Sequence, residues 1–393
     1  MDAEQALELV KQGSTLLLLD VPQHTLIGID TQIFFAGPVF MGIKMIPPGV
    51  HFIYYSSSSR EGKDFSPIIG FFVETSPSEV VIRRWNPLEE RLVKVAEEEE
   101  ERYSRAVKNM EFDRQLGPYT LMEYRNWRQL SSFLTKDIIE KIEPIGGEIT
   151  VACESRLVDD FPKSAIERSL HEQSMTSKFR RSDVKSVQKG CYFTPIPRIV
   201  KHKGISGQEL TSLNLDKTHL LERLLAAECG GNEDRLLGEL QFAFVAFLMG
   251  QSLEAFLQWK SLVSLLLGCS EAPFRTRTQF FTKFIRAIYY QLRHGFQKEH
   301  KGSSGMESTP LLDDSWFSDD NFLYRLCKDF FSLVDETPVV DGDLLTWTRK
   351  LKELLENTLG WSFQNRTYAD GLPYEEDDEF APVVEIVDES YLH

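Results

Sequence analysis

The stretch that decides the fold is RLLGELQFAFVAFLMG, residues 235–250. It predicts a helix with apolar side chains on nearly every side, and such a helix must be covered all round. Gly250-Gln251-Ser252 ends it, and LEAFLQWKSLVSLLLG, residues 253–268, predicts a second, amphipathic helix. The short break favours an antiparallel hairpin with residues 235–250 at the centre of a helical domain.

The chain on either side of this hairpin supplies further helices. Amphipathic patterns predict them within residues 217–229, 274–292, 319–334 and 344–359. Together they predict an all-α domain of five or six helices over residues 204–368. A single hairpin hints at a tetratricopeptide-like unit, but no fixed repeat period follows, so a solenoid is not expected.

The first hundred residues are rich in aromatic and β-branched residues between Gly and Pro. Six runs predict strands, at residues 14–20, 26–30, 39–46, 50–56, 68–74 and 79–85. The run VHFIYYS (50–56) is apolar at nearly every position, which predicts a central strand covered on both faces. His51 within it is expected to be a core histidine with a hydrogen-bonded ring.

Helices are expected to follow these strands. The acidic run Glu97–Glu101 favours a helix start, and Gly117-Pro118 favours its end. Residues 119–134 predict a helix that packs on the β-domain. The expected fold class is α+β with two domains. These are an antiparallel β-sandwich-like N-terminal domain with appended helices (1–203), the helical domain (204–368) and an extended acidic tail (369–393).

Composition limits the function. The chain has 393 residues and a formal net charge of −16. Proteins that bind phosphate backbones have clusters of Lys and Arg, so this negative net charge argues against direct RNA binding. Five scattered cysteines without a C-x-x-C pair indicate reduced thiols in the cytosol or nucleus. The expected location is the cytoplasm and the nucleus. The longest apolar run is about half a membrane span, so no membrane contact is expected.

The sequence contains no motif for catalysis or metal binding that we recognise. There is no phosphate-binding glycine loop, no H-E-x-x-H motif and no Cys/His cluster with zinc spacing. We therefore expect no enzyme activity, no metal, no cofactor and no small-molecule substrate. Catalytic residues that converge from distant segments remain an alternative.

A basic, linker-like segment covers residues 169–203. From Lys178 to Lys203 it has eight basic residues and one acid. It is either a solvated loop or a contact for RNA or an acidic protein partner. The candidate contact residues are Arg180, Arg181, Lys185 and Lys189.

The tail combines acids with a strand-like pattern. Its sequence EEDDEFAPVVEIVDESYLH (375–393) has five acids followed by an apolar run. As a strand this run has apolar residues on both faces, so it needs cover on both. It either adds to a partner's sheet or completes the chain's own β-domain. The candidate binding residues are Phe380, Ala381, Pro382, Val383, Val384, Glu385, Ile386 and Val387.

Several sequence segments together resemble those of one family. They are MIPPGVHFIYYSS (45–57), LGPY (116–119), LGELQFAFVAFLMG (237–250), EAFLQWK (254–260) and APVVEI (381–386). They look like the a-one/alpha-two repression (Aar-two) family of splicing factors. The resemblance implies a β-rich domain joined to a helical one, and a role without catalysis as an assembly factor of the U-five small nuclear ribonucleoprotein.

The resemblance also implies a partner. Members of this family bind the large spliceosomal scaffold protein at its RNase H-like and Jab1/MPN-like domains and keep an RNA helicase away until the particle matures. The tail strand bridges the two scaffold domains, and Ala381–Ile386 match it here. A general helical adaptor in another complex, with the tail docked on its own β-domain, is the alternative.

Overall fold

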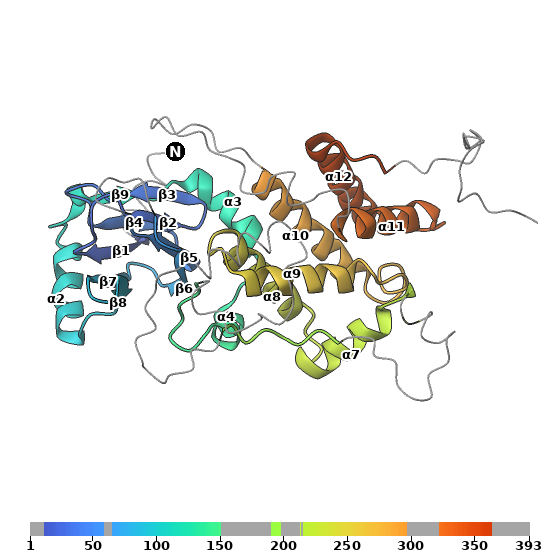
Figure 1. Cartoon of the computed structure of the whole chain (residues 1–393), viewed down its shortest axis with the longest axis horizontal. Coiled ribbons are helices and arrows are strands. Elements are labelled where there is room, and N and C mark those ends of the chain that lie inside the picture. The colour runs from blue at the N-terminus through green and yellow to red at the C-terminus, as the bar shows by residue number, and fades with distance from the viewer. Residues whose placement is uncertain are drawn as a thin grey trace, which may run out of the picture.

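The computed structural model describes residues 12–58, 65–150, 190–197, 213, 215–296 and 322–363. Two stacked β-sheets lie at one end of the molecule and a group of helices at the other (Figure 1). The predicted two-domain α+β fold is confirmed.

The β-domain is built from two sheets. The first has the order β8 (Arg91–Val93), β7 (Val80–Asn86), β1 (Ser14–Leu19), β4 (Gly42–Ile46) and β9 (Leu116–Pro118). The second has the order β3 (Gln32–Phe35), β2 (Leu26–Ile29), β5 (Gly49–Ser56) and β6 (Ile69–Thr75). Strand β5 lies inside its sheet and is buried over most of its length, as the pattern of VHFIYYS predicts.

The first sheet is mixed, which corrects the antiparallel prediction. Strands β1 and β7 pair in parallel, and so do β4 and β9, whereas the other pairings are antiparallel. The whole second sheet lies between β1 and β7 in the chain, so no tight hairpin sets their relative direction.

Three strands were missed by the sequence patterns. Strands β3, β8 and β9 have three or four residues each, too few to show alternation. The helix that starts at Glu97 was expected to run to Gly117, but it ends at Lys108. Leu116 then enters β9, where its side chain is buried.

The helical domain surrounds one buried helix. The helices in the described part of the chain are α2 (Glu97–Lys108), α3 (Leu121–Ser131), α4 (Lys136–Ile142), α7 (Thr218–Glu228), α8 (Asp234–Leu248), α9 (Leu253–Leu266), α10 (Thr278–Phe296), α11 (Phe322–Glu336) and α12 (Gly342–Leu359). Of these, α2 packs on β7 of the β-domain. Every residue of α8 from Leu236 to Leu248 is buried, and α3, α4, α9 and α10 pack against it. The prediction that residues 235–250 form the central helix is confirmed.

A glycine in α8 permits close packing. A Cβ atom at Gly238 would lie 2.6 Å from the carbonyl oxygen of Phe133 and 2.3 Å from Cδ1 of Ile138. Glycine is unfavourable within a helix, but here it lets the connection between α3 and α4 approach the backbone of α8.

The two domains share one hydrophobic core. The rings of Phe72 in β6 and Phe242 in α8 stack with 4.6 Å between their centroids. Phe52 and Tyr54 of β5 belong to the same buried cluster as the helices. The outer face of the second sheet therefore packs directly on the helical domain, while its inner face packs on the first sheet.

Candidate partner-binding surfaces and buried polar clusters

A polar cluster lies beneath the Pro47-Pro48 turn, which leads from β4 in the first sheet to β5 in the second. Asp30 and His51 are fully buried, with 2.7 Å between Oδ2 and Nδ1. The hydroxyl of Tyr119 donates to Oδ2 of Asp30 at 2.6 Å, and the amide of Phe52 donates to Oδ1 at 2.9 Å. Asp30 thus joins three segments of the β-domain that are far apart in sequence.

The ring of His51 has an acceptor at each nitrogen. Nδ1 faces the Asp30 carboxylate, and Nε2 donates to the carbonyl oxygen of Pro47 at 2.6 Å. Burial alone lowers the pKa of His51, but Asp30 and the two hydrogen bonds raise it above its ordinary value of 6.5. Below this raised pKa the ring is a cation, and its hydrogen bond to Pro47 braces the Pro47-Pro48 turn. This confirms the prediction of a hydrogen-bonded core histidine.

The same cluster fastens the β-domain to α3. Burial and the charge of Asp30 raise the pKa of Tyr119, so its hydroxyl stays protonated and donates. The indole nitrogen of Trp127 in α3 donates to the carbonyl oxygen of Val50 at 2.7 Å. Because α3 packs on α8 and α10 as well, the turn that begins β5 is coupled to the helical domain.

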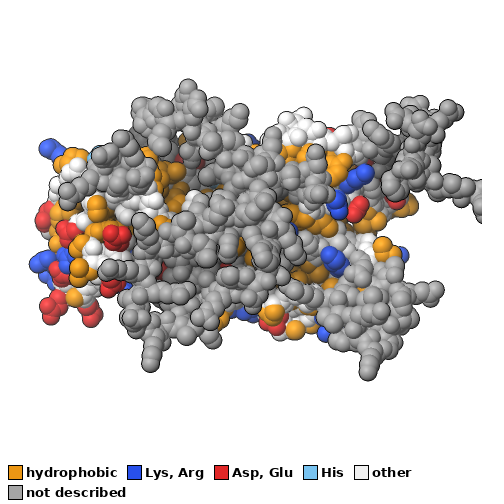
Figure 2. All heavy atoms as spheres, in the orientation of Figure 1, with side chains coloured by type: hydrophobic (Ala, Val, Ile, Leu, Met, Phe, Trp, Pro, Cys, Tyr) orange, Lys and Arg blue, Asp and Glu red, His pale blue; other side chains and the backbone are white. Residues whose placement is uncertain are grey.

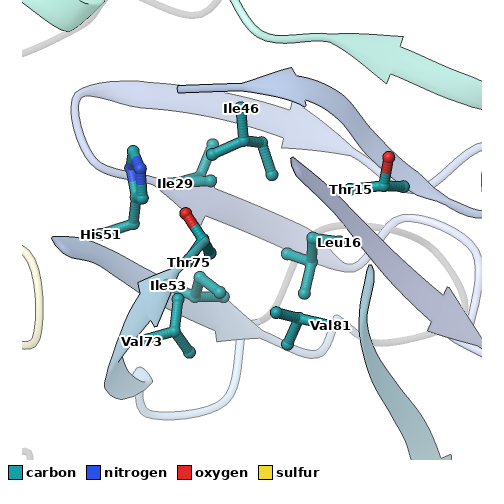
Figure 3. A pocket seen from close by; sticks show the side chains of 9 residues that line it. All are labelled: Thr15, Leu16, Ile29, Ile46, His51, Ile53, Val73, Thr75 and Val81. Carbon is teal, nitrogen blue, oxygen red and sulfur yellow. The ribbon is translucent and has the colours of Figure 1, made fainter. Parts of the chain in front are cut away.

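A narrow gap lies beside His51, between the two sheets. Isoleucine, valine, leucine and threonine side chains line it, with His51 at one end (Figure 3). The gap has no room for a water molecule. Its chemistry is that of a packed sandwich core.

A second buried acid holds a short segment across the helical domain. Glu239 of α8 accepts hydrogen bonds from the amide and the hydroxyl of Thr194, at 2.8 and 2.6 Å. The side-chain amide of Gln258 in α9 donates to the same carboxylate at 2.8 Å. Residues 190–197 are thereby tied to the α8–α9 hairpin. Sequence analysis missed this role, although one acid within an otherwise apolar helix is a visible signal.

The second sheet presents an apolar edge. Strand β3 is an edge strand among the described strands, and Ile33 and Phe35 on it are 40% and 52% exposed. Both side chains lie on the same face of the sheet as the residues of β5 and β6 that pack on the helices. An exposed, apolar edge strand is a place where another strand can add.

The predicted partner-binding residues lie outside the described residues. This holds for Phe380 to Val387 of the tail and for Arg180, Arg181, Lys185 and Lys189 of the basic segment. Their proposed contacts therefore remain predictions.

Other features of the described residues concern redox, metal and membrane chemistry. The thiols of Cys229, Cys269 and Cys327 are free and buried. Burial raises the pKa of Cys269 to about 12.

Within the described ranges, no three His, Cys, Asp or Glu side chains form a group able to hold a metal ion. No helix there combines the length and apolar character needed to cross a bilayer.

Each of the two domains matches a known family model. Residues 12–144 match the family model "AAR2 N-terminal domain", and residues 193–364 match "AAR2 C-terminal repeat region". The AAR2 homologue of Caenorhabditis elegans is 32% identical, over 90% of this chain and 95% of that protein. The human AAR2 homologue is 30% identical, over 92% and 93% respectively. The "A1 cistron-splicing factor AAR2" of Saccharomyces cerevisiae is 24% identical, over 71% and 77%.

The fold defines a two-domain α+β protein whose β-sandwich and helical bundle share a core. Both halves match one family over most of their length, and the chain belongs to the AAR2 family. The family resemblance inferred from the quoted sequence segments is confirmed. Membership supports a role as a splicing-related factor, and the names of these relatives indicate no catalytic family.

Proposed function

We propose that this protein is a non-catalytic assembly factor of the U-five small nuclear ribonucleoprotein. In this role it binds the large spliceosomal scaffold protein and blocks premature binding of an RNA helicase, in the cytoplasm and the nucleus. The observation that carries the proposal is the match to the AAR2 family along both domains, together with a relative that is named a splicing factor.

The rigid joining of the two domains supports this role. A shared core and the hydrogen bond from Trp127 to Val50 keep the β-domain and the helical domain in one orientation. A body of this kind can present fixed surfaces to two domains of a partner at once, because little conformational freedom is lost on binding.

The tail pattern supports strand addition to the scaffold. Val384 and Ile386 point to one face of a strand, and Val383 and Val387 to the other. Burying these four side chains would contribute roughly 5–8 kcal/mol before the cost of ordering the segment. Main-chain hydrogen bonds to the RNase H-like and Jab1/MPN-like domains would add to this.

A pull-down with these two scaffold domains tests the proposal. Deleting residues 371–393 should leave a folded protein that binds more than about tenfold more weakly, because it removes over 1.4 kcal/mol of contact. Val384→Asp with Ile386→Asp should have a similar effect. Deleting only residues 388–393 is the control and should change little. Unchanged affinity after the larger deletion would refute the bridging strand.

The exposed edge of β3 favours a second possibility for the tail. The apolar run from Phe380 to Val387 would then add to β3 of its own β-domain, beside Ile33 and Phe35. In that case the same deletion should lower the melting temperature by several degrees, with binding of the scaffold unaffected. Thermal unfolding followed by circular dichroism separates the two outcomes.

A further inference from the structure

Helix α10 is basic in a strongly acidic chain. It carries Lys283, Arg286, Arg293 and His294 and no acidic residue, while the whole chain has a net charge of −16. Lys283 pairs with Asp234 at 2.7 Å. Arg286 and Arg293 are exposed and form no ion pair with any residue that the structure describes. Their charges are therefore open to solvent on the outer side of α10.

Helix α3 lies beside α10 and runs in the opposite direction. Lys283 lies 5.9 Å from the ring centre of Phe133, just beyond the end of α3. At the other end, burial lowers the pKa of His294 and the nearby carboxylate of Glu123 partly offsets this. Helix α3 therefore flanks α10 along most of its length.

The outer sides of these helices form one surface. Helices α3, α8 and α10 pack against one another pairwise, so the sides of α3 and α10 that face away from α8 adjoin. On the far side of α10, Tyr290 lies 5.6 Å from Trp347 of α12, and the ammonium group of Lys350 lies 4.4 Å from the same indole ring.

We call this surface the basic face. Its cations are Arg286 and Arg293 of α10 and Lys350 of α12, on either side of the contact between Tyr290 and Trp347. Figure 2 shows Lys and Arg side chains, with acidic side chains beside them, at the end of the molecule where α11 and α12 lie. The proposed function does not use this face.

We propose that the basic face docks the acidic stretch Glu375–Glu379 of the chain's own tail. The five consecutive carboxylates are opposite in charge to the cations Arg286, Arg293 and Lys350, and the tether makes the contact intramolecular, with a high effective concentration. The proposal goes beyond scaffold binding, since it concerns the acids and not the strand that follows them.

The tail is long enough to reach the face. The described chain ends at Phe363, whose ring packs on Phe331 of α11 with 4.9 Å between centroids. Glu375 follows twelve residues later, and extended chain of that length spans roughly 40 Å. Trp347, at the edge of the basic face, lies twelve residues before the end of α12 at Leu359, about 18 Å at 1.5 Å per residue.

The overall charge favours the tail over RNA as the occupant. Arginines beside half-buried aromatic rings also suit single-stranded RNA. The net charge of −16, however, repels a free polyanion, whereas the tethered acids are already counted in that charge. Docking would hold the strand at Phe380–Val387 close to the helical domain, so a partner for that strand must compete with the basic face.

Zero-length carbodiimide coupling on the full chain tests the proposal. At low salt, peptide mapping should find links from Glu375–Glu379 to Lys350. Arg286→Ala with Arg293→Ala should lower their yield at least about threefold, because two exposed charge pairs are lost. About 0.5 M salt should lower the yield in the wild type as well.

The matched control removes two equally exposed cations at the other end of the molecule. Lys108→Ala with Arg114→Ala should leave the yield unchanged, and thermal unfolding of both double variants should match the wild type. No tail links in the wild type, or equal yields in both double variants, would overturn the proposal. Binding of a labelled single-stranded RNA that needs Arg286 and Arg293, whatever the charge of the tail, would also overturn it.

Discussion

The buried acids of the β-domain and of the helical domain have different kinds of partner. Asp30 in the β-domain is paired with the cation of His51 and accepts from Tyr119 and a backbone amide. Glu239 in the helical domain accepts from Thr194 and Gln258, which are neutral donors. Removing one partner should therefore be more costly at Asp30, where a buried charge loses its counter-charge.

The difference separates two structural roles. The Asp30 cluster holds together strands and a turn within the β-domain, and it contains a histidine whose pKa is raised by its pairing with Asp30. The Glu239 cluster attaches residues 190–197 to the surface of an already buried helix pair. Both depend on the apolar core that the two domains share, and that core should matter most.

Phe242→Ala should have the largest effect, because it opens a cavity at the contact between the domains. Phe242 is fully buried and stacks on Phe72 of β6. We expect a loss of about 4 kcal/mol in the free energy of unfolding, measured by urea titration. The control Leu88→Ala, at a 93% exposed site, should stay within about 0.5 kcal/mol. Two separate unfolding transitions in the wild type would contradict a shared core.

His51→Ala should come next, with a loss of about 3 kcal/mol, because Asp30 is left buried without its cation. Urea titration at pH 6 measures it. The control is His219→Ala, at a half-buried histidine on α7 that makes no hydrogen bond with the described residues. Equal effects for the two variants would show that the ion pair with Asp30 does not stabilise the fold.

Glu239→Gln should cost less, about 1–2 kcal/mol. The new amide is similar in shape, but its NH₂ group faces donors at Thr194 or Gln258, so at least one hydrogen bond is lost. Proteolysis near residues 190–197 should become faster in the same variant. Glu353→Gln, at an exposed site on α12, is the control for the loss of one carboxylate. Unchanged stability and cleavage would remove the role assigned to Glu239.

The pH dependence should be the smallest effect. The pKa of His51 is raised in the folded state, so the ion pair contributes fully below pH 6.5, and its contribution is lost as pH rises through the folded-state pKa. Between pH 6 and pH 9 the wild type should lose more stability than His51→Gln, and the difference isolates this ring. Parallel pH profiles would show that His51 is neutral in the fold.

Sequence patterns predicted much of the local structure. The six runs in the first hundred residues and the helices from α7 to α12 were found from periodicity, and the buried α8 from its apolar residues on all sides. These features depend on neighbours within a few residues. The tail strand at Phe380–Val387 and the basic segment also came from patterns, and they remain predictions because they lie outside the described residues.

By itself, then, the sequence determined the order and type of the long elements, the two-domain class and the family. Only the tertiary structure decided the parallel pairing of β1 with β7, the contact of Phe72 with Phe242 and the clusters around Asp30 and Glu239. It also placed Tyr290 of α10 beside Trp347 of α12, next to the ammonium group of Lys350. The physical reason is that periodicity reports which side of an element is apolar, whereas packing selects the distant partner that covers it.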